Sequence, residues 1–239
     1  MTRKITIVLV LLTSMQLSFS QKNDNHLPVG IDTLNKTIHS KDEFKIKKLY
    51  APALLIIAGV AVNSNNPERI KKEIVEERNE HWLSFRTHID DYLQFSPIAL
   101  AYTLDAAGVR SRTDIKNRTA ILIKGELGMT AVTFLLKKYT HEQRPDLSNY
   151  ASFPSGHTAQ AFAAATFLSE EYKHRLKWMP YVSYGIATSV GLLRMANNKH
   201  YISDVLVGAG IGILSVKLSY WTHQYKWNRS SIRNHDLQF

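Results

Sequence analysis

The stretch ASFPSGHTAQAFAAATFL, residues 151–168, decides the fold, because a polar turn runs directly into an apolar, alanine-rich segment. Pro-Ser-Gly-His before such a segment predicts a helix that begins at Ser155 and runs to about Ser169. Ser155, Gly156 and His157 then occupy its first turn, where unpaired backbone N–H groups bind anions and glycine permits a close approach. His157 can donate or accept a proton at neutral pH. A capped helix with an exposed histidine is the structural alternative.

Other apolar segments of similar composition follow one another along the chain, separated by charged connectors. None alternates with a period of two for long, and no internal repeat is present. Residues 66–91 carry an amphipathic pattern that predicts a surface helix. We therefore expect an all-α protein, a helical bundle of about six core helices in one domain at residues 49–222. The apolar segments are 50–62, 95–109, 120–136, 155–169, 178–193 and 205–221.

The two ends of the chain differ from this domain. Residues 1–20 start with two basic side chains and continue as an uncharged, mostly apolar run, which predicts an export signal; an uncleaved anchor helix is the alternative. Residues 21–48 are a polar lead-in, and residues 223–239 are a basic tail. Either form of the first segment takes the protein out of the cytoplasm.

The charge and cysteine content exclude several classes of function. The formal net charge is +10, but basic residues are scattered among acidic ones, as in ERIKKE at 68–73. Nucleic-acid binding would need a basic stripe with interleaved aromatics, so we expect no nucleic-acid partner. Anionic lipid head groups or a phosphorylated substrate fit better. The absence of cysteine excludes disulfides, thiolate metal sites and a cysteine nucleophile.

Whether the predicted helices cross a membrane depends on their length. A crossing helix needs about 20 mostly apolar residues, and several segments are shorter. Segment 120–136 also carries Lys124 and Glu126, which we interpret as polar contacts inside the bundle. Mean hydropathy is −0.20, low for a protein with many crossings. The apolar segments nevertheless favour membrane association.

Two further clusters carry titratable groups. Lys137 and Arg144 are seven residues apart and are followed by proline, which suits a helix end and a turn that bring two cations onto one anion. A solvated helix end is the alternative. His200 and Asp204 are four apart, so on a helix they share a face, and the carboxylate can accept the Nδ1 proton and leave Nε2 free to attack. Arg194 adds a third cation; a plain helical ion pair is the alternative.

Together the clusters supply the cations, the nucleophile and the acid that phosphoryl transfer without a metal requires. The order Lys-x6-Arg-Pro, Pro-Ser-Gly-His and Arg-x5-His-x2-Ser-Asp over residues 137–204 resembles the type 2 phosphatidic acid phosphatase (PAP2) superfamily. That superfamily includes lipid phosphate phosphatases, bacterial class A acid phosphatases and vanadium-dependent haloperoxidases. One departure is Leu193, where the family often has serine before the third-motif arginine.

The resemblance implies a role for each residue and no metal or cofactor. His200 would attack phosphorus and form a phosphohistidine, oriented by Asp204. His157 would protonate the leaving alcohol and then activate the water that hydrolyses the intermediate. The implied phosphate-binding groups are Lys137, Arg144, Ser155, Gly156 and Arg194.

We expect the substrate to be a membrane lipid phosphate: phosphatidic acid, phosphatidylglycerol phosphate, a polyprenyl diphosphate or a lipid A phosphate. A soluble periplasmic class A-type acid phosphatase is the main alternative. A haloperoxidase holding vanadate in the same pocket and a non-catalytic lipid-binding protein are weaker ones, because haloperoxidases resemble longer chains and a binding protein would not need every titrating group.

The site is expected to face the periplasm from a bacterial inner membrane. The loops 137–154 and 194–204 are separated by two helices and so lie on one side, whereas basic residues gather in the opposite connectors, 110–119 and 170–177. An exported lead-in would reverse this orientation if all six segments crossed. We therefore expect segment 50–62, the shortest, to lie along the outer surface, which leaves an odd number of full crossings.

Overall fold

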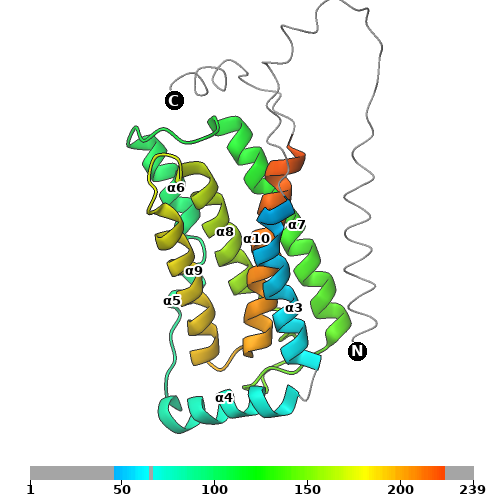
Figure 1. Cartoon of the computed structure of the whole chain (residues 1–239). Coiled ribbons are helices and arrows are strands. Elements are labelled where there is room, and N and C mark those ends of the chain that lie inside the picture. The colour runs from blue at the N-terminus through cyan, green and yellow to red at the C-terminus, as the bar shows by residue number, and fades with distance from the viewer. Residues whose placement is uncertain (1–45, 65–66, 224–239) are drawn as a thin grey trace, which may run out of the picture.

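The computed structural model describes residues 46–64 and 67–223. The expected signal at 1–20, nearly all of the lead-in and the tail after residue 223 lie outside the described residues. Within them the prediction of an all-α fold is confirmed, since the described elements are helices and include no strand (Figure 1). The helices are η1 (Ile46–Leu49), α3 (Tyr50–Ser64), α4 (Pro67–Trp82), α5 (Ile89–Leu93), α6 (Ser96–Ala106), α7 (Ile115–Thr140), α8 (Gly156–Tyr172), α9 (Met179–Ala196) and α10 (Ile202–Thr222).

Helix α8, which contains the alanine-rich stretch, is the centre of the bundle. It packs against α6, α7, α9 and α10 (Figure 1). A helix that is apolar on all sides is stable only when it is buried on all sides, and small side chains let its neighbours approach closely. The fully buried alanines of α8 are Ala159, Ala161, Ala163, Ala164 and Ala165.

Helix α10 packs between α8 and α3, and glycines permit both contacts. A Cβ added at Gly212 would lie 2.2 Å from the Ala159 carbonyl oxygen of α8. A Cβ at Gly210 would lie 2.7 Å from the Pro52 carbonyl oxygen of α3. The two backbones on either side of α10 are therefore too close for any residue other than glycine at these positions.

The chain is a membrane protein with three helical stretches long and apolar enough to cross a bilayer: Ile46–Ser64, Ile115–Thr140 and Ile202–Thr222. The prediction that segment 50–62 is too short to cross is wrong. The turn η1 adds Ile46 and Leu49 to α3, so the stretch reaches 19 residues. On α7, large apolar side chains such as Leu127 and Phe134 are exposed.

Helix α4 lies across one end of the bundle (Figure 1). The α4 end, as we call it, contains the last turns of α3, α7 and α9 and the first turns of α8 and α10. The helix predicted over 66–91 stops earlier than expected, at Trp82. The backbone of Thr87 pairs instead with the Asn197 amide after α9: Thr87 N donates to Asn197 Oδ1 (2.9 Å), and Asn197 Nδ2 donates to the Thr87 carbonyl (2.9 Å). This tertiary contact replaces the last turns of the helix.

Several polar side chains elsewhere in the bundle have partners, although the buried Nε of Arg118 has none among the described residues. Gln160 of α8 donates to Glu126 of α7 (2.9 Å), and Lys124 donates to the Thr222 hydroxyl of α10. The interpretation as a polar contact inside the bundle is therefore confirmed for Glu126 but wrong for Lys124, which is exposed. At the end opposite α4, the buried Arg118 guanidinium contacts Asp105 (2.6 Å).

Candidate active site

Three segments that are distant in the sequence meet at the α4 end: the loop after α7, the start of α8 and the turn between α9 and α10. Ser155 N donates to the Asp204 carbonyl oxygen (3.0 Å), which joins the first turns of α8 and α10. Thr140 Oγ1 donates to the Phe153 carbonyl oxygen (3.0 Å), which ties the loop back to α7. The three clusters recognised in the sequence thus lie together.

The start of α8 is open toward the lysine of the first cluster. Ser155 is the N-cap, and its buried hydroxyl accepts from the Thr158 amide (3.4 Å) and lies 2.8 Å from the Thr158 hydroxyl. Gly156 is the first helical residue, so its N–H belongs to the group that a helix leaves without an intrahelical acceptor. A Cβ at Gly156 would meet nothing closer than 3.9 Å, and one of the two atoms at that distance is Lys137 Cε.

His200 and Asp204 are paired, although not as two residues of one helix. Helix α10 begins only at Ile202, because Asp204 accepts the Tyr201 amide (3.0 Å) in a capping box. The prediction that both lie on a helix is therefore wrong, but His200 Nδ1 is still 3.3 Å from Asp204 Oδ2. Ser152 Oγ also donates to Asp204 Oδ2 (2.5 Å). The carboxylate fixes the orientation of the imidazole.

His200 is uncharged at neutral pH. Burial lowers the pKa of His200 to about 4; the Asp204 carboxylate opposes this shift, and the positive charges of Lys137 and Arg144 reinforce it. Since Asp204 accepts at Nδ1, the lone pair of the neutral ring is at Nε2. An unprotonated nitrogen held in one orientation is the requirement for a nucleophile.

Lys137 and Arg144 approach the site from the end of α7 and from the loop that follows. Lys137 Nζ donates to the Ala151 carbonyl oxygen (2.6 Å) and faces Gly156. The buried Nε–H of Arg144 has no hydrogen-bond partner among the described residues, and neither does that of Arg194. Burial, together with the charge of Arg194, lowers the pKa of Arg144. A buried donor without an acceptor is costly, so an anion at this position would be stabilised.

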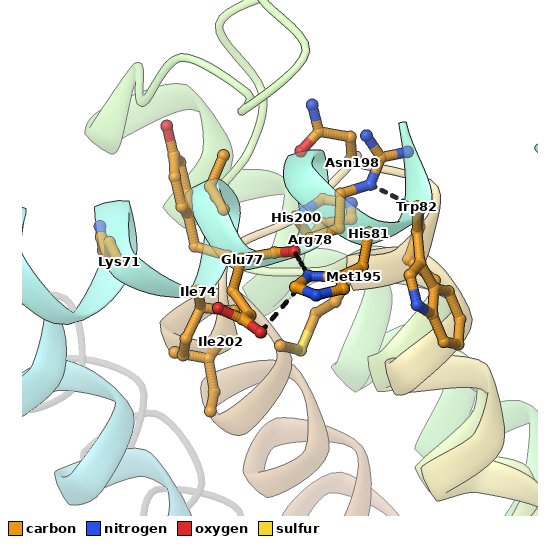
Figure 2. A pocket seen from close by; sticks show the side chains of 13 residues that line it. Lys71, Ile74, Glu77, Arg78, His81, Trp82, Met195, Asn198, His200 and Ile202 are labelled. Carbon is orange, nitrogen blue, oxygen red and sulfur yellow. Dashed lines mark hydrogen bonds and ion pairs between the residues drawn. The ribbon is translucent and has the colours of Figure 1, made fainter. Parts of the chain in front are cut away.

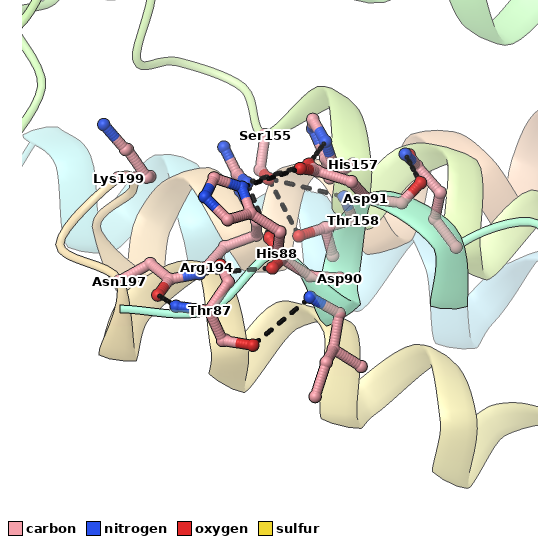
Figure 3. Close-up of polar contacts among 12 residues, drawn as sticks. Thr87, His88, Asp90, Asp91, Ser155, His157, Thr158, Arg194, Asn197 and Lys199 are labelled. Carbon is pink, nitrogen blue, oxygen red and sulfur yellow. Dashed lines mark hydrogen bonds and ion pairs between the residues drawn. The ribbon is translucent and has the colours of Figure 1, made fainter. Parts of the chain in front are cut away.

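Arg194 has two acidic neighbours that the sequence motifs did not reveal (Figure 3). Its Nη1 lies 2.6 Å from Asp90 and 3.7 Å from Asp91, both on the short helix α5. Asp90 is fully buried and also accepts from Asn197 Nδ2 (3.2 Å). The guanidinium is thereby held at the last turn of α9, and part of its charge is neutralised. The only signal in the sequence was an acidic pair between apolar residues, Ile89-Asp-Asp-Tyr-Leu93.

His157 also contacts α5. Its Nε2 is 2.8 Å from Asp91 Oδ1, and its side chain is 31% exposed, so it borders the open part of the site. Burial and the charge of Arg194 lower the pKa of His157, whereas Asp91 raises it. The net direction is downward, so a bound anion would have to raise the pKa again for His157 to act as an acid at neutral pH.

The loop between α7 and α8 is fastened to the α9–α10 turn. Lys199 forms an ion pair with Asp146 (2.5 Å), and Ser152 N donates to the Glu142 carbonyl oxygen (2.9 Å). Burial would raise the pKa of Asp146, but the hydrogen bond and charge of Lys199 lower it to about 2. The pair therefore stays ionised, and it connects the loop that contains Arg144 to the α9–α10 turn.

A cavity of about 450 Å³ lies beside the site, under α4 (Figure 2). His200 lines it, together with apolar side chains of α4 and α10 such as Ile74 and Ile202. Arg78 of α4 fastens the helix over the cavity by donating from Nε to the Ala196 carbonyl oxygen (2.9 Å). None of the predicted phosphate-binding residues lines the cavity, so it is a neighbour of the cation cluster.

One group in the site has the composition of a metal site. The ligand atoms of Asp90, Asp91 and His157 lie within 4.8 Å of one another. Arg194 already contacts both carboxylates, so a guanidinium supplies the positive charge that a metal would bring.

This end of the helical bundle therefore brings together the predicted cations and two histidines, one of them paired with a carboxylate. Residues 119–228 match the model of the PAP2 superfamily. This match confirms the resemblance to that superfamily that the three motifs indicated. The described part of the match contains the three sequence clusters, whereas α5 lies before it.

Two curated proteins are similar in sequence to part of this chain. The chain is 38% identical over 141 residues to a lipid A 1-phosphatase of Porphyromonas gingivalis, covering 58% of this chain and 31% of that protein. It is 33% identical over 82 residues to a probable lipid phosphate phosphatase 4 of Arabidopsis thaliana, covering 30% of this chain and 27% of the other. The chain thus spans less than a third of the length of either relative.

Two crystal structures are similar to part of this chain. LpxE of Aquifex aeolicus has a TM-score of 0.46 at 24% identity, over 60% of this chain and 92% of that one. The first transmembrane PAP2-type phosphatidylglycerolphosphate phosphatase from Bacillus subtilis has a TM-score of 0.45 at 21% identity, over 73% and 94% of the two chains.

Proposed function

We propose that this protein is a metal-independent phosphatase that removes phosphate from a membrane lipid through a phosphohistidine at His200. The observation that carries the proposal is the pairing of a buried, neutral His200 with Asp204. Next to that pair lie the unpartnered Nε–H groups of Arg144 and Arg194 and the open start of α8 at Gly156. A nucleophile and an oxyanion site are thus adjacent.

In the first step His200 Nε2 attacks phosphorus, and the bond from phosphorus to the lipid oxygen breaks. His157 gives its proton to that leaving oxygen, so the lipid departs as an alcohol. In the second step neutral His157 takes a proton from water, the water oxygen bonds to phosphorus, and the bond to His200 breaks. Orthophosphate leaves and both histidines return to their starting states. The cations stabilise the charge on the non-bridging oxygens throughout.

The lipid nature of the substrate is supported by the membrane-crossing helices and by the names of the two curated relatives. Because the chain is 38% identical over 141 residues to a lipid A 1-phosphatase, a lipid A phosphate is the first substrate to test. The same features support a lipid phosphatase over a soluble acid phosphatase.

Phosphate release should be measured in mixed micelles with a lipid A phosphate, phosphatidic acid, phosphatidylglycerol phosphate and a polyprenyl diphosphate. His200→Ala is the control. We expect release from at least one lipid, and none with the variant. If the protein released phosphate from none of them, or released it equally with His200→Ala, the proposed function would be wrong.

We also propose that the site faces the periplasm. The end opposite α4 carries the basic connectors 110–114 and 173–178, and Lys47 and Lys48 of η1 lie at the same end. Because positive residues near membrane ends mark the cytoplasmic side, that end should be cytoplasmic. Since the stretch 46–64 is long enough to cross, residue 46 and the active site then lie on opposite sides of the membrane. The proposed orientation therefore requires that the predicted export signal at 1–20 does not carry residue 46 across the membrane.

Single cysteines can test this orientation, because the chain has none of its own. Asn149→Cys reports on the site, and Lys177→Cys and Lys48→Cys report on the other end; Asn149 and Lys177 are exposed. An impermeant reagent on spheroplasts should label only Asn149→Cys. Labelling of the other two positions alone would mean that the export signal sets the orientation and that the site faces the cytoplasm.

A further inference from the structure

The two acidic residues of α5 take different partners, although they are adjacent in sequence. Asp90 is fully buried and binds the Arg194 guanidinium and the Asn197 amide. Asp91 points to the open side, where its carboxylate contacts His157. Because Asp90 anchors α5, the carboxylate of Asp91 is held at a fixed position next to the imidazole (Figure 3).

The contact between His157 and Asp91 decides which ring nitrogen carries the proton. Nε2 is 2.8 Å from Asp91 Oδ1, and a carboxylate can only accept at that distance. Nε2 is therefore the N–H nitrogen, and Nδ1 is the one left for a reacting group. The other oxygen of Asp91 is 3.3 Å from Nδ1 of the exposed His88.

The charges around His157 come from several elements. Asp90 and Asp91 of α5 are anionic, and Arg194 of α9 is cationic, 3.7 Å from Asp91. From α7, Lys137 lies against Gly156, the residue before His157. Cations thus oppose protonation of the ring, and Asp91 is the only carboxylate in direct contact with it among the described residues.

We propose that Asp91 is a positioning residue for His157, holding its Nε2–H so that Nδ1 exchanges the proton with the leaving oxygen, and stabilising the imidazolium. The mechanistic part of this inference rests on the proposed function. The proton that leaves Nδ1 goes to the alkoxide of the lipid, and Nδ1 regains one from the attacking water. In both steps Nε2 keeps its proton and donates it in a hydrogen bond to Asp91.

The pKa of His157 supports the same assignment. Burial and Arg194 lower this pKa, and the hydrogen bond and charge of Asp91 act against them. Removing the negative charge should lower the pKa further, because a neighbouring opposite charge is worth about one unit or more. A lower pKa means that a smaller fraction of His157 is protonated at neutral pH and able to act as the general acid.

Kinetics of Asp91→Asn test the proposal, with Asp91→Glu as the conservative variant. His88→Gln is the matched control, since it removes the contact between Asp91 and His88 and leaves the carboxylate and its contacts with His157 and Arg194. For Asp91→Asn we expect the basic limb of the kcat/KM profile to move down by about one pH unit or more. At neutral pH, kcat should fall by about tenfold or more for a lipid phosphate and little for nitrophenyl phosphate. Compared with Asp91→Asn, Asp91→Glu should show a smaller shift of the basic limb and a smaller loss of kcat on the lipid phosphate.

Histidine NMR provides a readout that needs no turnover. In protein labelled with ¹⁵N-histidine, the His157 resonance, assigned by loss in His157→Gln, should report Nε2–H in the unsubstituted chain. Asp91→Asn should give a mixture of tautomers and a lower titration midpoint, and His88→Gln neither change. An unchanged tautomer and midpoint in Asp91→Asn would overturn the proposal whatever the activity. Absence of phosphatase activity in the unsubstituted protein would refute the proposed function and leave the NMR result to decide on Asp91.

Discussion

Replacing Gly156 with alanine tests whether the start of α8 binds phosphate, because the substitution should lower activity without lowering the stability of the folded protein. The new Cβ would lie 3.9 Å from Lys137 Cε and from Thr133 Cγ2, which is ordinary van der Waals contact. The protein should therefore fold. Alanine should even stabilise α8 slightly, by up to about 1 kcal/mol, because glycine is the poorer helix former.

The methyl group would, however, occupy the side of the helix start that faces Lys137, where a phosphate oxygen has to approach the Gly156 N–H. Loss of one donor to a developing oxyanion lowers kcat by about 10²–10³-fold in enzymes with oxyanion holes. We expect Gly156→Ala to lose activity within this range, measured as phosphate release in mixed micelles.

Gly185→Ala is the matched control. Gly185 also lies in a helix, and a Cβ there would meet nothing within 4 Å. The two variants should show the same small change in thermal unfolding temperature, and only Gly156→Ala should lose activity. Full activity in Gly156→Ala, or equal loss in both variants, would refute the assignment of the helix start to phosphate binding.

Three other predictions follow from the same site. His157→Ala should slow release from a lipid phosphate by about 10²–10⁴-fold but from nitrophenyl phosphate much less; equal losses would exclude His157 as the acid. Orthovanadate should inhibit and prolonged chelation should not; rescue of a chelated protein by magnesium would contradict the cation-only site. Because the pKa of His200 is lowered to about 4, below its ordinary value near 6.5, the folded state should lose stability as pH falls from 6.5 toward 4. His200→Asn, which does not titrate, should show a smaller decrease in unfolding temperature over that range.

The sequence was sufficient where a local signal specified the structure. Alanine enrichment after Pro-Ser-Gly-His predicted the central helix, although α8 begins one residue later than expected, at Gly156 after the N-cap Ser155, and continues past Ser169 to Tyr172. Glu126 could be interpreted as an internal contact, because an isolated charge in an apolar helix needs a partner, but the same interpretation was wrong for the exposed Lys124. Asp204 was recognised as the partner of His200 from its spacing, but the capping box that starts α10 was not.

The sequence was insufficient where tertiary contacts decide the structure. Helix α5 has only five residues, so it gives no periodic signal. The role of its two carboxylates could not be predicted, because it depends on a long-range contact with Arg194 of α9. The end of α4 at Trp82 likewise depends on Asn197, more than a hundred residues later. The length of the first crossing helix was underestimated because basic residues interrupt the apolar pattern in η1.

The central claim is that phosphate passes through a covalent bond to His200, and rapid-quench mass spectrometry tests it most directly. The protein should be mixed with a cleavable lipid phosphate or nitrophenyl phosphate, quenched in alkali within the first turnover and digested. We expect an acid-labile phosphate on the peptide containing His200, absent from His200→Ala and more abundant in His157→Ala, where hydrolysis of the intermediate is slowed. An acid-stable phosphate on Ser155, or turnover by His200→Ala at the rate of the unsubstituted protein, would contradict the account.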